Sequence, residues 1–412
     1  MVMVENDELK NDEQAILLLW HRVNTSLASY YKLIKAFGSP EGALKVSAQA
    51  WADLGLHANH VARQQDASDS EDALFLAQID ADVQANNYHL LFVHDDDYPL
   101  QLNQLFDPPP VLFYRGNVAR LSDPQIAIVG SRKPTEHAQK FTFDMAQYLS
   151  DKGFTITSGL AEGVDGHAHL GALAQSPDKA GRTVGVMGTG IDVIYPKRHA
   201  HLINRIVNEG GCIITELLPK TPASKHTFPR RNRLVAGLSL GTIVTEATVQ
   251  SGSLITARLT NEQGKQVFAL PSRIDNANAE GCHHLIREGA TLIYHPDQVI
   301  EDIVHQLPDP NIDTPDVIPA TYKAKANPIA PQPTNSNRQS FSHLQAPSTN
   351  PKPAVDIPEH LQAIWTHLDF DGQDLDALVD KTGLDTPTLL AQLMELELMG
   401  VVEQVGGRYK RV

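Results

Sequence analysis

The spacing of apolar residues divides the chain into a helical start, a long alternating centre and a short helical end. In residues 12–84, apolar side chains recur at helical intervals, as at Trp20, Val23 and Leu27, and Gly, Ser and Pro residues interrupt the pattern. Short amphipathic segments joined by tight turns predict a small helical bundle, which we place in residues 1–85.

The period changes after Tyr88. Two apolar runs, residues 90–93 and 111–114, flank an acidic, proline-rich segment and predict two strands at the edge of a sheet. Strands and helices then alternate. The predicted strands are residues 125–129, 154–157, 183–187, 212–215, 242–245, 266–270 and 291–294, and the predicted helices are residues 135–149, 163–174, 199–207, 228–238, 252–262 and 282–287. Strands rich in Val and Ile that alternate with helices predict a Rossmann-like, doubly wound, mainly parallel sheet in residues 86–304.

The last hundred residues contain a polar stretch followed by renewed order. Residues 305–355 are rich in Pro, Asn and Ser, which predicts a flexible linker. In residues 356–412, three helices (361–368, 375–379 and 389–398) and two strands (401–405 and 408–410) predict a winged-helix domain. Its would-be reading helix, residues 387–399, holds Glu395 and Glu397 but no basic residue. We therefore expect it to contact a partner instead of the DNA major groove.

Composition places the chain among ordinary globular proteins. Of its 412 residues, 42% are hydrophobic, and no apolar run approaches the roughly 18 residues of a membrane span. The first residues are acidic where a signal peptide would be basic and then apolar, so we expect a cytoplasmic protein without membrane contact. Cys212 and Cys282 lack partners at metal-binding spacing and are interpreted as ordinary thiols.

The net charge of −15 argues against nucleic-acid binding until it is divided along the chain. Residues 1–85 carry 13 acidic and 6 basic residues and residues 356–412 carry 11 and 4, so the centre has a net charge of only −1. A local basic patch there can attract phosphate although the whole chain repels it at long range. In residues 1–85 we expect a bundle like SAM or helix-hairpin-helix modules, whose acidity favours an inert or protein-binding role.

The strongest basic cluster lies in residues 224–237. It contains Lys225, His226, Phe228, Arg230, Arg231, Asn232 and Arg233, and no acidic residue occurs from Pro219 to Thr245. Arginines hold phosphates through forked hydrogen bonds, and a phenyl ring can stack on an unpaired base, so the cluster suits single-stranded DNA. In the alternative interpretation, Phe228 and Pro229 begin a helix with core residues Leu234 and Val235 and solvated arginines.

Three more loops are expected at the same edge, because ligands of doubly wound sheets bind beyond the carboxyl ends of the strands. Gly130-Ser131-Arg132 follows a strand and precedes a helix, which suits a phosphate. A later loop brings Lys197, and Ser251-Gly252-Ser253 begins another helix with hydroxyls suited to capping or phosphate binding. The chain has no GxxxxGK[ST] motif, and Gly188-Thr189-Gly190 lacks the third glycine of GxGxxG.

Catalytic and metal-binding patterns are weak. Asp165, His167 and His169 would spread around a helix in poor ligand geometry, so we predict no metal and expect Asp165 to cap its helix and accept backbone N–H groups. No Ser/His/Asp order or HExxH motif occurs, so we predict neither catalytic residues nor a cofactor.

The loops together resemble the DNA-processing protein A family (DprA, also called Smf). The resemblance runs from about residue 98 to 294 and rests on IAIVGSR, SGLAEGVDGHAHLGAL, GTGIDVIYP, TELLP, KHTFPRRNRLVAGLS and EATVQSGSLITARLTNEQGKQVFALP. Glu162 stands where the family often has a basic residue, Ser272 where it has glycine and His283 where it has asparagine.

This resemblance implies a non-enzymatic protein that binds single-stranded DNA, forms homodimers through the Rossmann-like domain and loads RecA during natural transformation. It also implies DNA contacts at Arg132, Lys225, Phe228, Arg231 and Arg233. The rival hypothesis is a Rossmann-like nucleotide-binding enzyme, such as a phosphoribohydrolase, which Gly241-Thr242 and Thr245-Glu246 would suit but the arginine cluster would not.

Overall fold

The computed structural model describes residues 9–174, 182–304, 357–368, 373–399, 401–405 and 408–411. These residues belong to two compact units, residues 1–317 and 318–412. The linker predicted in residues 305–355 lies outside the described residues. Within the described ranges, no helix is both long enough and apolar enough to cross a membrane.

A nine-stranded sheet organises the first unit. Its order is β1-β2-β6-β5-β4-β3-β7-β8-β9, and every pair from β6 to β9 is parallel, whereas β1 and β2 are antiparallel. The strands are β1 His89–Phe92, β2 Val111–Gly116, β3 Gln125–Val129, β4 Thr155–Ser158, β5 Thr183–Val186, β6 Cys212–Thr215, β7 Gly241–Val244, β8 Gln266–Ala269 and β9 Thr291–Leu292. The predicted doubly wound, mainly parallel sheet is therefore confirmed, and the two strands predicted at a sheet edge pair antiparallel.

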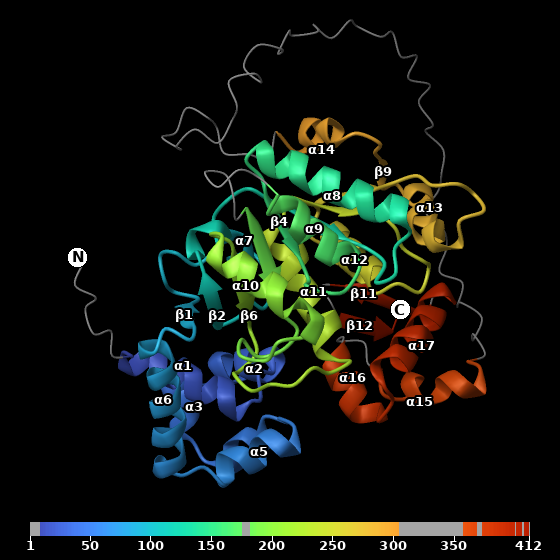
Figure 1. Ribbon diagram of the computed structural model, residues 1–412. Coiled ribbons are helices and arrows are strands. Elements are labelled where there is room, and N and C mark those ends of the chain that lie inside the picture. Colours follow the sequence, from blue (N-terminus) through green and yellow to red (C-terminus); the bar gives the residue numbers. More distant parts are fainter. Residues whose placement is uncertain are drawn as a thin grey trace, which may run out of the picture. The chain divides into compact units, whose positions relative to one another are not determined.

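Helices cover both faces of this sheet (Figure 1). They are α7 Leu100–Asn103, α8 Glu136–Asp151, α9 Val164–Ala172, α10 Ala200–Asn208, α11 Thr227–Leu238, α12 Ser253–Glu262, α13 Glu280–Arg287 and α14 Pro296–Ile303. Side chains alternate between the faces along each strand. In β6, Ile213 packs with Ile203 of α10, whereas Cys212 and Ile214 belong to the core that contains Leu234 of α11.

Six short helices precede the sheet, at the blue end of the chain in Figure 1. They are α1 Asn11–Arg22, α2 Leu27–Phe37, α3 Pro40–Lys45, α4 Ala48–Asp53, α5 Ala58–Gln65 and α6 Asp69–Gln84. Four of them begin after a serine whose hydroxyl accepts a backbone N–H of the first turn, namely Ser26, Ser39, Ser47 and Ser68. Trp20 of α1 is fully buried in the same core as Phe113 of β2, so this bundle packs directly on the sheet.

The second unit is small and mixed. Its helices are α15 Gln362–Trp365, α16 Leu375–Thr382 and α17 Thr386–Leu398, and its strands are β10 Gln373–Asp374, β11 Val402–Val405 and β12 Arg408–Arg411. The strands pair antiparallel in the order β10-β12-β11, so the predicted two-stranded wing gains a third strand. Glu395 of α17 pairs with His360 at 3.0 Å.

Candidate nucleic-acid interface

The predicted site lies where the sheet reverses its winding. From β3 the chain passes through α8 to β4 on one side, whereas the neighbour of β3 on the other side is β7, which leads to α12 and β8. Loops that leave adjacent strands toward opposite faces open a crevice at the carboxyl edge of the sheet. The segments after β3 and β7 border this crevice, and they hold the predicted Gly130-Ser131-Arg132 and Ser251-Gly252-Ser253.

Glu246 holds the loop after β3 in place. Its carbonyl accepts the Ser131 N–H at 2.6 Å, and its carboxylate accepts the Thr135 N–H at 3.0 Å and the Thr135 hydroxyl at 2.7 Å. Gly130 is required because a Cβ there would lie 2.7 Å from Val164 Cγ2 and 2.8 Å from the Glu246 carbonyl. The clamped loop leaves Arg132 exposed at its tip.

Arg231 is buried in a notch at the end of β4. A Cβ on Gly159 would lie 1.4 Å from its Nη1, so only glycine leaves room for the guanidinium. The side chain is 6% exposed, and its Nε has no hydrogen-bond partner among the described residues. Burial lowers the pKa of Arg231 to about 10, the Asp165 carboxylate opposes that shift, and Arg132 adds to it. Arg132 and Arg231 therefore concentrate positive charge at one point of the edge.

Asp165 supports this notch, but it does not cap its helix as the sequence predicted. One of its carboxylate oxygens accepts the backbone N–H groups of Gly159 at 3.1 Å and Ala161 at 3.2 Å, both in the preceding loop. The N-cap of α9 is Gly163, which makes no side-chain cap. Asp165 is fully buried, and this burial raises its pKa while Arg231 lowers it. The carboxylate thus shapes the loop that receives the Arg231 guanidinium.

Phe228 forms an aromatic pair with Tyr195, which lies in the loop that also holds Lys197. Their ring centroids lie 5.2 Å apart with planes tilted by 37°. Gly188 allows the approach, because a Cβ there would lie 2.6 Å from Phe228 Cδ1. Tyr195 remains 46% exposed. The pair offers an aromatic surface at the same carboxyl edge of the sheet as Arg132 and Arg231.

Arg230 and Arg233, which the sequence places in the basic cluster, lie on a different side of α11 and pair with Glu216. The Arg230 Nε donates to Glu216 at 2.9 Å, and Arg233 Nη2 pairs with the other oxygen of the same carboxylate. The Glu216 side chain is 3% exposed and those of the two arginines are 15% and 17% exposed. The alternative interpretation, in which the arginines of α11 are solvated, is wrong for Arg230 and Arg233 because both side chains are largely buried.

Glu216 and Arg230 also connect α11 to the N-terminal helices. The Trp20 indole donates to the Glu216 carbonyl at 2.9 Å, and the Arg230 guanidinium lies 5.6 Å from the Trp20 ring centroid and donates to Thr25 Oγ1 at 3.2 Å. Arg233 Nη1 donates to the Asp107 carbonyl at 3.0 Å. We call Glu216, Arg230 and Arg233 the buried ion cluster. It joins the bundle, α11 and the segment before β2.

Asn232 and the serine loop support each other. Asn232 Nδ2 donates to the Gly252 carbonyl at 3.3 Å, and the hydroxyls of Ser251 and Ser253 lie 2.6 Å apart. Gly252 is exposed, whereas Ser253 is buried. These contacts hold the start of α12 against α11.

Lys197 and Lys225 are exposed, on the short 3-10 turn before α10 and just before α11. The three departures from the family pattern also find contacts. Glu162 pairs with Arg198 at 2.9 Å, and the His283 ring nitrogen lies 3.3 Å from the Ser272 N and 3.0 Å from its carbonyl. Ser272 and His283 therefore contact each other, and Glu162 neutralises the charge of Arg198.

His167 and His169 of α9 do not form a metal site with Asp165, because His169 turns into the fold. His169 is fully buried and its Nδ1 lies 2.7 Å from the Thr183 hydroxyl, inside the fold. Burial is the largest cause that lowers its pKa, to about 3. His169 is therefore a neutral core residue.

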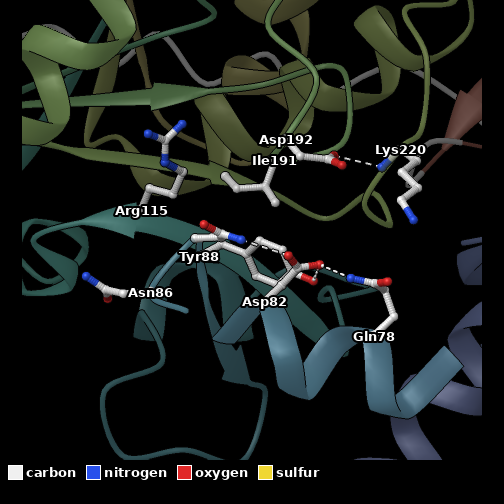
Figure 2. Close-up of a pocket in the computed structure, with 9 residues that line it drawn as sticks. Gln78, Asp82, Asn86, Tyr88, Arg115, Ile191, Asp192 and Lys220 are labelled. Atoms are coloured by element: carbon white, nitrogen blue, oxygen red, sulfur yellow. Dashed lines mark hydrogen bonds between the residues drawn. The ribbon is translucent and has the colours of Figure 1, made fainter. Parts of the chain in front are cut away.

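A hollow lies elsewhere, between the end of α6 and the loops after β5 and β6 (Figure 2). It measures about 400 Å³ and is lined by Gln78, Asp82, Asn86, Asn87, Tyr88, Arg115, Ile191, Asp192 and Lys220. Asp82 already accepts from Asn87 at 2.8 Å and Gln78 at 3.0 Å. The hollow contains none of the predicted site residues.

These features define a class: a doubly wound sheet with a cationic and aromatic carboxyl edge, followed by a small winged unit. The family model of DNA recombination-mediator protein A matches residues 89–304, about half of the chain, and that of the DprA winged helix domain matches residues 346–408. The chain belongs to the DNA recombination-mediator protein A family. The predicted family and the predicted winged-helix domain are confirmed.

Known relatives agree with this assignment. The chain is 35% identical to Protein Smf of Escherichia coli over 329 residues, which cover 79% of this chain and 78% of that protein. It is 42% identical to DNA processing protein DprA of Streptococcus pneumoniae over 208 residues, 50% of this chain and 72% of that protein. A solved structure of DNA processing protein A from Streptococcus pneumoniae superposes with a TM-score of 0.60 at 32% identity, covering 72% of this chain and 99% of that one.

Proposed function

We propose that this protein binds single-stranded DNA along the carboxyl edge of its sheet. The observation that carries the proposal is the convergence of Arg132, Arg231 and the Phe228–Tyr195 pair from separate loops onto that edge. A flexible strand needs both kinds of group: cations for its phosphates and an aromatic face for its bases.

Phosphates would be held by guanidinium and backbone groups. Arg132 is exposed on a clamped loop, and Arg231 presents a desolvated charge beside it. Lys197 and Lys225 would add screened, long-range attraction.

Bases would stack on Phe228 and Tyr195 without being identified. Stacking accepts every base, since each has a π-face, and the cations would contact the backbone. We therefore expect low sequence preference. Among the predicted contacts, Asn232 and the serine loop would support the edge, and Arg230 and Arg233 would keep the buried ion cluster intact.

The finer steps rest on family membership. We propose that the protein acts as a non-enzymatic recombination mediator in the cytoplasm, protecting incoming strands and loading RecA in natural transformation, and that it forms homodimers through the Rossmann-like domain. The acidic winged-helix domain would contact a partner.

The rival nucleotide-processing enzyme loses its main support. Its acid would be Glu246, which is 2% exposed and has both carboxylate oxygens bonded to Thr135. A carboxylate held this way serves the loop after β3 and is closed to a substrate.

The direct test is fluorescence anisotropy of labelled poly-dT, with a duplex of equal length and a nucleoside monophosphate as competitors. We expect the single strand to bind far more tightly than duplex and the logarithm of affinity to fall linearly with the logarithm of salt concentration. Release of the strand by the monophosphate at equal concentration, or its turnover, would instead support the nucleotide enzyme.

A further inference from the structure

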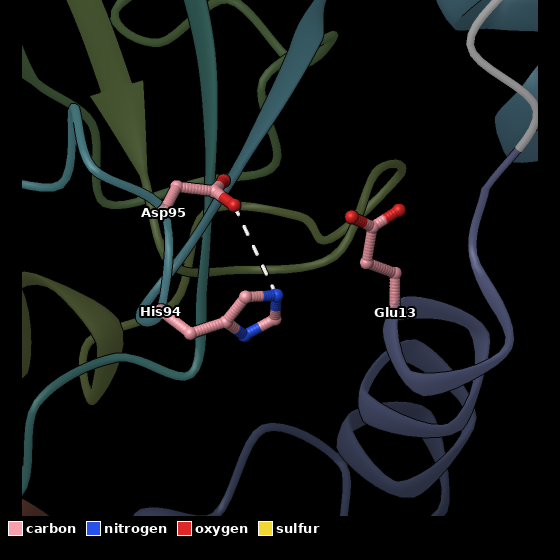
Figure 3. A group of neighbouring side chains, drawn as sticks. All are labelled: Glu13, His94 and Asp95. Atoms are coloured by element: carbon pink, nitrogen blue, oxygen red, sulfur yellow. Dashed lines mark ion pairs between the residues drawn. The ribbon is translucent and has the colours of Figure 1, made fainter.

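A group of oxygen and nitrogen atoms between the first turn of α1 and the loop after β1 has the composition of a metal site. One carboxylate oxygen each from Glu13 and Asp95 and a ring nitrogen of His94 lie within 4.8 Å of one another. Figure 3 shows the three side chains around a common space. Asp12 adds a carboxylate oxygen 3.9 Å from His94 Nε2, the same distance as Asp95 Oδ1.

Each carboxylate is fixed through one oxygen while the other stays available. Asp95 Oδ2 accepts the Phe92 N–H at 2.6 Å, Glu13 Oε2 accepts the Lys10 N–H at 2.9 Å, and Asp12 Oδ1 accepts the Glu13 N–H at 3.1 Å. Such outer contacts orient ligands and are typical of metal sites. Their second oxygens make only longer contacts, of 3.5 Å to Lys10 and 3.9 Å to His94, which a cation could replace.

The imidazole is also oriented. The His94 ring stacks on Phe92 with centroids 5.7 Å apart and planes within 18°. Its Nε2 makes only long contacts of 3.9 Å to the two aspartates. A cation at about 2.0–2.2 Å from each ligand needs donor atoms roughly 3.5 Å apart, so small side-chain rotations would close the site.

Charge favours a divalent cation. Three carboxylates face one imidazole and one ammonium, that of Lys10, whose Nζ lies 3.5 Å from Glu13 Oε1. The Lys10 side chain is 75% exposed and can move into solvent. An imidazole among carboxylates suits Zn²⁺ or Mn²⁺ better than Mg²⁺.

We propose that Glu13, His94 and Asp95, with Asp12 as an additional ligand, bind a divalent transition-metal ion of the Zn²⁺ or Mn²⁺ type. The ion links the N-terminal bundle to the sheet, because α1 supplies two ligands and the loop after β1 supplies the others. Open coordination positions face solvent, since the His94 side chain is 42% exposed. The site is independent of the proposed DNA interface.

The test is calorimetric titration of chelator-treated full-length protein with Zn²⁺ and with Mg²⁺, together with thermal unfolding in each metal. Asp95→Asn keeps an oxygen for the Phe92 N–H, and His94→Ala removes the imidazole. His284→Ala is the matched control, because His284 is also about half exposed and pairs with a glutamate, Glu288.

We expect one Zn²⁺ per chain, a Tm that rises with Zn²⁺ by a few degrees or more, and weaker binding of Mg²⁺. Both site variants should lose at least tenfold in Zn²⁺ affinity and lose the Tm rise, while His284→Ala keeps them. Equal Zn²⁺ binding by all four proteins, no binding by wild type, or equal affinity for Mg²⁺ would overturn the proposal.

Discussion

Two sides of one helix use the same residue type for different purposes. On one side of α11, Arg231 lies beside Arg132, whose side chain is exposed. On the other side, Arg230 and Arg233 share the carboxylate of Glu216, and Arg230 contacts the N-terminal bundle. Each side has two arginines and one nearby carboxylate, but only the first side presents an exposed arginine to solvent.

The difference shows how exposure separates binding from support. An exposed cation can attract an anionic ligand, whereas a buried, paired cation is costly to disturb. The aromatic and cationic edge can thus bind a strand while the buried ion cluster keeps α11 in position. Four substitutions would break or sharpen this contrast, and we take them from the largest expected effect to the smallest.

Glu216→Gln should have the largest effect on stability. It would leave two largely buried arginines without their anion, a change that typically costs about 3–5 kcal/mol. Urea unfolding followed by tryptophan fluorescence measures it, because Trp20 lies against the cluster. The matched control, Glu209→Gln, breaks a half-buried pair with Arg205 and should cost less than about 1 kcal/mol. Equal effects of the two substitutions would contradict the role of the cluster.

His169→Gln should change the acid stability of the fold. The pKa of His169 is lowered to about 3 in the folded protein, below its ordinary value of 6.5. The unfolded chain therefore binds a proton between these values that the folded one does not, and stability is lost as pH falls from 6.5 toward 3. The glutamine side chain keeps a donor for Thr183 but does not titrate. The variant should therefore lose a few kcal/mol less of its free energy of unfolding as pH falls. The measurement is the free energy of unfolding at pH 7, 5 and 4. If it falls equally with pH in both proteins, the burial argument is contradicted.

Phe228→Ala tests the aromatic part of the edge. Loss of one stacking residue typically costs about 1–3 kcal/mol of single-strand affinity. Because the phosphate contacts remain, the salt dependence of binding should not change. Anisotropy with labelled poly-dT measures both quantities, and Phe106→Ala, an exposed phenylalanine away from the site, is the control. If the salt slope changes while the affinity does not, the bases of the strand do not stack on Phe228.

Glu162→Gln should have the smallest effect and the opposite sign. It removes an anion near the edge and releases Arg198, whose pair with Glu162 is largely exposed. An exposed pair contributes at most about 1 kcal/mol to stability, so the Tm should stay nearly constant while single-strand affinity rises a few-fold at low salt. Weaker binding by the variant would show that the pair orders the loop for the strand.

Much of the fold could be predicted because it is encoded locally. Strands rich in Val and Ile that alternate with helices indicated the parallel sheet, and apolar residues at helical spacing indicated the helices of the bundle. Sequence spacing also located Gly130-Ser131-Arg132 and the arginine segment at one sheet edge, since parallel strands end at the same side.

The division of the arginines could not be predicted, because burial and pairing depend on distant segments. Glu216 lies 14 residues before Arg230 and 17 before Arg233, outside the helix, and Thr25 is about two hundred residues away from Arg230. The contact between Tyr195 and Phe228 could not be predicted, because the two rings come from separate segments. Asp165 accepts backbone N–H groups as predicted, but it does not cap its helix, because the preceding loop folds back onto its carboxylate.

The central claim is tested most directly by measuring poly-dT affinity across a salt series and urea stability for Arg132→Ala and Arg233→Ala side by side. We predict that Arg132→Ala weakens binding, reduces the salt slope by about 0.7 and leaves stability unchanged. Arg233→Ala should lose stability and keep the affinity and salt slope of the folded protein. If Arg233→Ala instead reduces affinity and slope at unchanged stability, the two sides of α11 do not have separate roles.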